Sequence, residues 1–314
     1  MELYLNIPET DLKVCRIGLG TANAGLSGSG EGTGRLLDAY LGLGGNLIDT
    51  ARVYSDWVKP ETGRSERVIG DWLRSRGRHD DAVLLTKGGH PRLDSMGVGR
   101  LSREEMQSDL DLSLKALSVD CIDIYCYHRD DAKRPVEELV ETMEGFRRAG
   151  KIRYYACSNW TVGRMREADA YCRKMGYRGF VLNEALYNYG SDDMKPMADP
   201  TLAVAGGEML AYHRGNPSSV LTAYTSMCSG FFSRLEREGR EAVAGSPYFT
   251  EGNLKRFRRL REIAGDHGAT VSEALLGFVL TRRPRMIALA GAGSLAHLKE
   301  IMETFRFDFR EEEY

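Results

Sequence analysis

Eight short apolar runs, rich in β-branched and aromatic residues, recur along the 314-residue chain, and a helical pattern follows each of them. Each run is continuously apolar rather than alternating, which is typical of parallel strands covered on both faces. The runs span residues 14–20, 46–50, 82–87, 121–128, 151–158, 179–185, 219–225 and 285–291. Eight such strands alternating with helices, with no break in composition, predict a closed (β/α)8 TIM barrel as a single domain over residues 1–314.

An open, doubly wound sheet is the alternative fold for this pattern. Such a sheet normally carries a glycine fingerprint directly after its first strand. The glycine-rich stretch "GLSGSGEGTG" (25–34) contains no G-x-G-x-x-G and begins several residues after the first run. We interpret it as a loop before a helix, with a phosphate cradle as the other interpretation.

Two helices are predicted with clear end signals. In residues 101–118, Ser102 precedes Glu105 by three positions, which indicates a capping box. Residues 135–150 begin with a proline and end with a glycine, as helices commonly do. Two further pieces lie outside the repeating unit. Residues 1–14 predict a β-hairpin below the barrel, and the long segment 226–284 predicts extra helices towards the C-terminus.

Composition argues against several classes of partner. The net charge is −2, so no overall attraction to nucleic acid or to an anionic membrane is expected. No apolar run approaches the roughly 20 residues that span a bilayer. The N-terminus lacks the pattern of a signal peptide, so we expect a cytoplasmic chain. No C-x-x-C pair occurs, so we expect no metal site and interpret the cysteines as small buried residues: Cys15, Cys121, Cys126, Cys157, Cys172 and Cys228.

Polar residues end three consecutive apolar runs. Asp49 lies near the end of the second run, Lys87 ends the third, and His128 ends the fourth. Tyr54 follows Asp49 by five residues. Because the carboxyl ends of barrel strands meet at one face, these four side chains are predicted to converge there. Taken singly, each has a structural interpretation: a helix cap, a solvated strand end, a structural histidine and a surface aromatic.

The four side chains together suggest acid–base chemistry. A tyrosine of pKa ~10 is a poor proton donor or acceptor at neutral pH. An ammonium ~4 Å away contributes about 4 kcal/mol at an effective dielectric of ~20, or about three pKa units at most. We therefore expect Asp49 to keep Lys87 charged and Lys87 to lower the pKa of Tyr54. His128 would orient a substrate oxygen or share the proton transfer.

At this point the motifs resemble the aldo-keto reductase family. "GNLIDTARVY", "LLTK", "YCYHRDD" and "GKIRYYACSN" match its motifs in order, and "VCRIGLGT", "SVLTAYTSMCSGFF" and "LREIAGDHGATVSEALLGFVLTR" extend the match over essentially the whole chain. The resemblance implies NAD(P)H-dependent reduction of an aldehyde or ketone, or the reverse oxidation. It makes Tyr54 the general acid, supported by Asp49, Lys87 and His128. Aromatic side chains with polar neighbours near the site suit a sugar or keto-sugar as well as an aryl aldehyde.

The resemblance also implies a set of cofactor contacts. Ser158, Asn159 and Glu184 fall where the family holds the nicotinamide carboxamide, and Tyr224 falls where a tyrosine stacks on the ring. Residues 226–232 match the stretch over the pyrophosphate, and 291–297 the adenosine-phosphate loop. The full implied set is Gly20, Thr21, Asp49, Ser158, Asn159, Glu184, Tyr224, Thr225, Ser226, Ser229, Gly230, Phe231, Gly291, Gly293, Ser294 and His297.

Two positions depart from the family pattern. Glu184 stands where the family usually has glutamine, and an ionised glutamate cannot donate a hydrogen bond. Residues 291–297 lack the lysine or arginine that NADP-selective members place there. We therefore hypothesise use of NAD, or of both cofactors. The basic run "KRFRRLR" (255–261) has helical spacing and is interpreted as a solvated face.

Four residues are candidates for contact with a small-molecule substrate, and each has packing beneath a loop as its alternative: Asn23, Trp57, Trp160 and Tyr187. A non-catalytic nicotinamide-binding subunit is the alternative function, although all four residues of the acid–base group are present. A metal-dependent barrel hydrolase would need several His, Asp and Glu ligands at strand ends, and His128 is the one histidine there.

Overall fold

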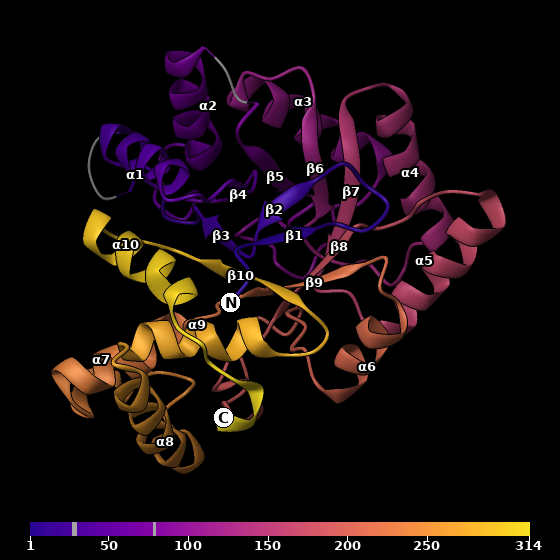
Figure 1. Ribbon diagram of the computed structural model, residues 1–314. Coiled ribbons are helices and arrows are strands. Elements are labelled where there is room, and N and C mark those ends of the chain that lie inside the picture. Colours follow the sequence, from indigo (N-terminus) through magenta and orange to yellow (C-terminus); the bar gives the residue numbers. More distant parts are fainter. Residues whose placement is uncertain (27–29, 78–79) are drawn as a thin grey trace.

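The computed structural model describes residues 1–26, 30–77 and 80–314, so residues 27–29 of the glycine-rich stretch lie outside the described residues. Eight parallel strands form a closed barrel in chain order, with the last strand pairing with the first (Figure 1). They are β3 (Ile17–Gly20), β4 (Leu47–Asp49), β5 (Val83–Gly88), β6 (Ile122–Tyr127), β7 (Ile152–Ser158), β8 (Leu182–Leu186), β9 (Val220–Tyr224) and β10 (Met286–Ala290). The predicted (β/α)8 barrel is confirmed.

Helices surround the barrel, and at least one follows each of its strands along the chain (Figure 1). They are α1 (Gly30–Gly42), α2 (Arg64–Arg76), α3 (Arg103–Leu117), α4 (Val136–Arg148), α5 (Val162–Met175), α6 (Gly207–Gly215), α7 (Phe231–Glu238), α8 (Glu251–His267), α9 (Val271–Thr281) and α10 (Leu295–Glu303). Three of them, α7, α8 and α9, lie in the long connection between β9 and β10. The expected extra helices are therefore confirmed.

The helix ends follow the local signals in the sequence. Before α3, the Ser102 Oγ accepts from the Glu105 N–H, and the Glu105 carboxylate accepts from the Ser102 N–H, both at 3.2 Å. This reciprocal capping box satisfies two amide groups that a helix start leaves unpaired. The helix α4 begins directly after Pro135, and the chain leaves it through Gly150 at φ 71°.

The N-terminal hairpin consists of β1 (Tyr4–Asn6) and β2 (Lys13–Cys15). The first apolar run was predicted as one barrel strand from residue 14, and this is wrong at its start. The chain changes sheets at Arg16, whose N–H donates to the Leu3 carbonyl while its own carbonyl accepts from the Ala288 N–H of β10. The buried Arg16 guanidinium donates to the Leu280 carbonyl, which fixes this crossing point.

The hairpin fills the amino-terminal end of the barrel, as predicted. Ile7, Leu12 and Val14 are buried in one cluster with barrel-interior side chains such as Leu47 and Leu85. In Figure 1 the hairpin crosses in front of the barrel strands. Apolar burial therefore closes this end and leaves the carboxyl ends of the strands as the face on which a site can form.

Candidate active site

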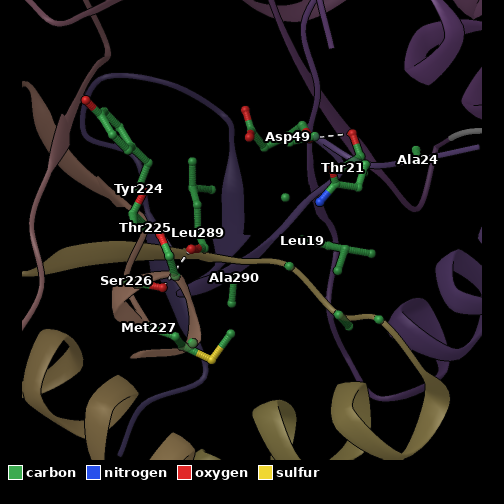
Figure 2. Close-up of a pocket in the computed structure, with 18 of the residues that line it drawn as sticks. Leu19, Thr21, Ala24, Asp49, Tyr224, Thr225, Ser226, Met227, Leu289 and Ala290 are labelled. Carbon is green, nitrogen blue, oxygen red and sulfur yellow. Dashed lines mark hydrogen bonds between the residues drawn. The ribbon is translucent and has the colours of Figure 1, made fainter. Parts of the chain in front are cut away.

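A cavity of about 1300 Å³ opens at the carboxyl ends of the barrel strands. Its wall includes Gly20 of β3, Asp49 of β4, Glu184 of β8 and Tyr224 of β9. In Figure 2, Asp49 and Thr21 lie on one side, and Tyr224 lies on another. The Thr21 hydroxyl donates to the Asp49 carbonyl at 2.8 Å, which joins the ends of β3 and β4. The topology thus places strand-end polar groups around one space.

Lys87 is buried beside this cavity and contacts two other members of the acid–base group, Asp49 and Tyr54. Its ammonium forms a short ion pair with the Asp49 carboxylate. It also donates to the Tyr54 hydroxyl at 3.2 Å and to the Thr50 carbonyl at 3.1 Å. A second carboxylate, that of Glu184, lies 3.4 Å from the same nitrogen. The predicted convergence of Asp49, Tyr54 and Lys87 is therefore present, with one acid more than sequence reasoning counted.

The second acid changes the electrostatics of the group. Burial alone would lower the pKa of Lys87, but the Asp49 and Glu184 carboxylates raise that pKa well above its usual value. Burial and the Asp49 carboxylate raise the pKa of Tyr54, and Lys87 offsets this only in part. The expected net lowering of the Tyr54 pKa is therefore wrong. The phenol stays protonated over the neutral range.

His128 follows β6 and lies beside Tyr54, with their ring centroids 5.6 Å apart in an edge-on arrangement. The ring of His90 packs against the ring of His128, with the two centroids 4.7 Å apart. Sequence reasoning missed this neighbour. Burial and the Arg129 guanidinium lower the pKa of His128 well below its ordinary value, so the imidazole is neutral. Its buried Nδ1 has no hydrogen-bond partner within the part of the chain that the structure describes.

The side chain of Asn159 is already hydrogen-bonded within the protein. Its Oδ1 accepts from the Tyr224 hydroxyl at 2.7 Å and from the Ala203 N–H at 3.0 Å. Its Nδ2 donates to the His128 carbonyl at 3.2 Å and to the Ser158 hydroxyl at 3.0 Å. Asn159 therefore positions its neighbours, and it lines the cavity with its hydrogen-bonding groups largely occupied.

The distant part of the cavity is formed by the loops after β9 and β10. Thr225, Ser226 and Met227 lie near Leu289 and Ala290 in Figure 2. The Ser226 hydroxyl donates to the Leu289 carbonyl at 2.7 Å, which ties the two loops together. Further along the same wall lie the predicted residues Ser229, Gly230, Gly291, Gly293, Ser294 and His297.

Three of the predicted contacts differ from expectation. Trp160 is fully buried between Tyr127 and Phe180, and Tyr187 stacks on Phe278, so neither lines the cavity. The prediction that these two residues contact the substrate is therefore wrong. Phe231 is likewise buried and does not reach the cavity wall.

The other two substrate candidates lie nearer the site. Asn23 lines the cavity. Trp57 is 47% exposed, and its ring centroid lies 6.5 Å from that of Tyr54, at the rim rather than on the wall. Contact of Trp57 with a bound molecule would therefore occur from the edge of the opening.

Cations at the distant end of the cavity were missed by sequence reasoning. Arg234 and Arg237 of α7 line the same wall as Ser294 and His297. Arg237 is 70% exposed in its side chain, with the Glu238 carboxylate at 3.8 Å as its ion-pair partner. The sequence could have predicted that these residues share one helix face, because positions 230, 233, 234 and 237 follow the i, i+3, i+4, i+7 spacing.

With this geometry established, comparison with known proteins identifies the family. The model of the Aldo/keto reductase family matches residues 16–314. The chain belongs to the aldo/keto reductase family. As a member, it is an NAD(P)-dependent oxidoreductase that acts on small-molecule carbonyl compounds or the corresponding alcohols. Within the described residues, no helix is long and apolar enough to cross a membrane, and no His/Cys/Asp/Glu group is arranged to hold a metal.

Several proteins of this family are similar to the chain over most of its length. An aryl-alcohol dehydrogenase of Pestalotiopsis microspora is 25% identical over 311 residues, covering 96% of this chain and 76% of that protein. A norsolorinic acid reductase B of Dothistroma septosporum is 26% identical over 310 residues, covering 93% and 74%. The crystal structure of a thermostable aldo-keto reductase with the inhibitor epalrestat has a TM-score of 0.73 and 26% identity, covering 99% and 97% of the two chains.

Proposed function

We propose that this aldo/keto reductase reduces aldehydes or ketones, or oxidises the corresponding alcohols, with Tyr54 as general acid and base. One observation supports this most directly: the charged Lys87 donates to the Tyr54 hydroxyl at 3.2 Å on the wall of a large cavity. A nicotinamide cofactor supplies or accepts the hydride when bound. The residues of the chain transfer the proton.

In the reducing direction, Tyr54 transfers its phenolic proton to the carbonyl oxygen. Its raised pKa keeps that proton available at neutral pH. Lys87 stabilises the phenolate left behind, because its ammonium stays charged between two carboxylates. His128, held neutral by burial, orients the substrate oxygen through a ring nitrogen. In the oxidising direction the same tyrosine takes the proton back.

The cavity offers groups suited to each end of a nicotinamide cofactor. Near Tyr54, the Glu184 Oε1, which has no hydrogen-bond partner among the described residues, and the Ser158 hydroxyl suit a carboxamide. Tyr224 offers an aromatic ring. At the distant end, Arg237 suits a ribose 2′-phosphate, whereas Glu300 suits a free 2′-hydroxyl. We propose that the enzyme uses both NADP and NAD, with Arg237 favouring NADP.

For the substrate we propose an aromatic aldehyde rather than a sugar. The proposal follows the names of two relatives, the Pestalotiopsis microspora protein and an NADP(+) aryl-alcohol dehydrogenase of Phanerodontia chrysosporium. Apolar wall residues such as Ala22, Ala24 and Leu202, with the Trp57 ring at the rim, fit an aryl ring. Asn23 is the polar candidate on the same wall.

Turnover by a single isosteric variant tests the proposed function. Purified enzyme is assayed with NADPH or NADH and a panel of aryl aldehydes and keto-sugars, beside Tyr54→Phe. The variant is expected to lose about 10²- to 10⁴-fold in kcat, because it lacks the proton that is transferred. Its Kd for NADPH is expected to change by less than about twofold, which shows that the fold and the site are intact.

Two results would refute this assignment. If the Tyr54→Phe variant turns over at the wild-type rate, Tyr54 is not the general acid and base. Wild type that binds the cofactor but reduces no carbonyl compound favours the alternative, a non-catalytic nicotinamide-binding subunit.

A further inference from the structure

Glu184, Asp49 and Lys87 place two carboxylates and one ammonium in the same buried space. The Glu184 side chain is 2% exposed and that of Asp49 is 4% exposed. Two carboxylates against one ammonium leave an uncompensated negative charge, which is costly to bury. One of the two acids is therefore expected to hold a proton at neutral pH.

The contacts indicate which acid is protonated. Asp49 contacts the Lys87 ammonium directly, whereas the nearest Glu184 oxygen lies 3.4 Å from it. Burial raises the pKa of Glu184 to about 8, an effect that Lys87 offsets only in part and Asp49 reinforces. Burial raises the pKa of Asp49 as well, so the two acids titrate as a pair. The direct contact with Lys87 favours Asp49 as the ionised member and Glu184 as the protonated one at neutral pH.

One oxygen of Glu184 is free to bind something else. Its Oε1 is buried and lacks a hydrogen-bond partner among the residues that the structure describes, although Glu184 lines the cavity. A buried polar atom without a partner is uncommon and requires an explanation. A neutral carboxyl group offers one donor and one acceptor, as the glutamine amide of the family pattern does. An ionised Glu184 offers acceptors and a negative charge.

We infer, on the basis of the nicotinamide position proposed above, that Glu184 makes the enzyme bind the oxidised and the reduced cofactor with different affinities. In its neutral form Glu184 accepts the carboxamide of either state. In its ionised form Glu184 attracts the nicotinamide ring of the oxidised cofactor, which carries a positive charge. The ionised form also lacks the O–H that can donate a hydrogen bond to the carboxamide of the reduced cofactor. Binding of the oxidised cofactor therefore expels a proton from Glu184 to solvent.

Other titratable groups lie within electrostatic range of Glu184, and the cysteines and tyrosines among them do not titrate near pH 8. Burial raises the pKa of Cys126 on β6 and of Cys157 on β7 well above the usual value. Burial also raises the pKa of Tyr54 and of Tyr224 on β9. Lys87 stays charged for the reasons given above. Asp49 is the one neighbour that titrates together with Glu184, and its contact with the Lys87 ammonium keeps it the ionised member of the pair.

Equilibrium binding to wild type and Glu184→Gln tests this inference. Kd values for NADP+, NADPH, NAD+ and NADH are measured from about pH 6 to about pH 9. In wild type, affinity for the oxidised form relative to the reduced form is expected to rise at least about tenfold over this range. In Glu184→Gln the ratio is expected to stay constant within about twofold. This variant keeps the size of the side chain, and circular dichroism checks that it folds.

Calorimetry supplies a second measurement that does not depend on the variant. In buffers of different ionisation enthalpy near pH 7.5, binding of NADP+ to wild type is expected to release up to one proton per site. Tyr54→Phe is expected to keep this release, which separates Glu184 from the phenol as the source.

Failure of this inference and failure of the proposed function give different results. A flat wild-type ratio, no proton release, or the same pH dependence in Glu184→Gln overturns the inference and leaves the proposed function standing. If none of the four cofactors binds at any pH, the proposed cofactor site is itself wrong.

Discussion

Lys87 is only 1% exposed, and a lysine so buried would tend to lose its proton. Asp49 and Glu184 both lie within ion-pair distance and keep it charged. Sequence reasoning placed Asp49 beside Lys87 correctly, because both lie at the ends of neighbouring strands. It treated Glu184 as a cofactor contact only, so it missed the second carboxylate beside Lys87. It also gave too little weight to burial, which is the main cause of the rise in the Tyr54 pKa. The order of residues in the sequence does not show which side chains lie close together across a barrel.

The contribution of Lys87 to the acidity of Tyr54 is testable by substitution. Lys87→Met removes the ammonium that lowers the phenol pKa, so that pKa should rise further. By the Coulomb estimate, the apparent pKa governing turnover is expected to move upward by about one to three units. Alcohol oxidation, which needs the phenolate, should fall most at neutral pH. The measurement is kcat against pH in both directions. A profile identical to that of wild type would argue against the role of Lys87.

The helix α7 supplies the charged face at the distant end of the cavity. Gly230, Ser233, Arg234 and Arg237 lie along one side of this helix or its N-terminal boundary and line the cavity. Of the two arginines, Arg234 donates to Glu238 and to the Ala242 carbonyl. The more exposed Arg237 is therefore the one with the greater freedom to reach a bound phosphate.

Cofactor selection by α7 can be measured with one substitution. Arg237→Ala is expected to raise the Kd for NADPH about fivefold to tenfold, because it removes one charge-assisted hydrogen bond. The Kd for NADH should stay within about twofold of wild type. Arg258→Ala, on the exposed face of α8, serves as the matched control and should change neither value. Equal losses for both cofactors would contradict selection by Arg237.

Across the whole molecule, the parts that follow from local signals were predictable. Continuous apolar runs predicted eight strands, and the Ser102 capping box predicted the start of α3, because both depend on nearby residues. The change of sheets at Arg16 and the packing of Trp160 depend on tertiary contacts, so sequence spacing could not reveal them. That one domain spans residues 1–314 stays a prediction.

The hairpin should contribute to stability and not to the site. Ile7→Ala removes a fully buried side chain from the barrel floor and is expected to cost about 2–5 kcal/mol in the free energy of unfolding. Urea denaturation measures this change. Val98→Ala, at a position 62% exposed, is the control and should cost less than about 0.5 kcal/mol. Because the hairpin lies opposite the cavity, the Kd for NADPH should not change, and a weakened Kd would show that the two ends are coupled.

The hairpin that occupies the floor also has a consequence for the order of binding in the proposed reaction. With apolar side chains closing that end, both reactants must enter and leave the proposed site through the same rim. Two molecules that share one entrance cannot pass each other, so the one bound deeper arrives first and departs last. Steady-state kinetics of the proposed reaction should therefore be sequential and ordered.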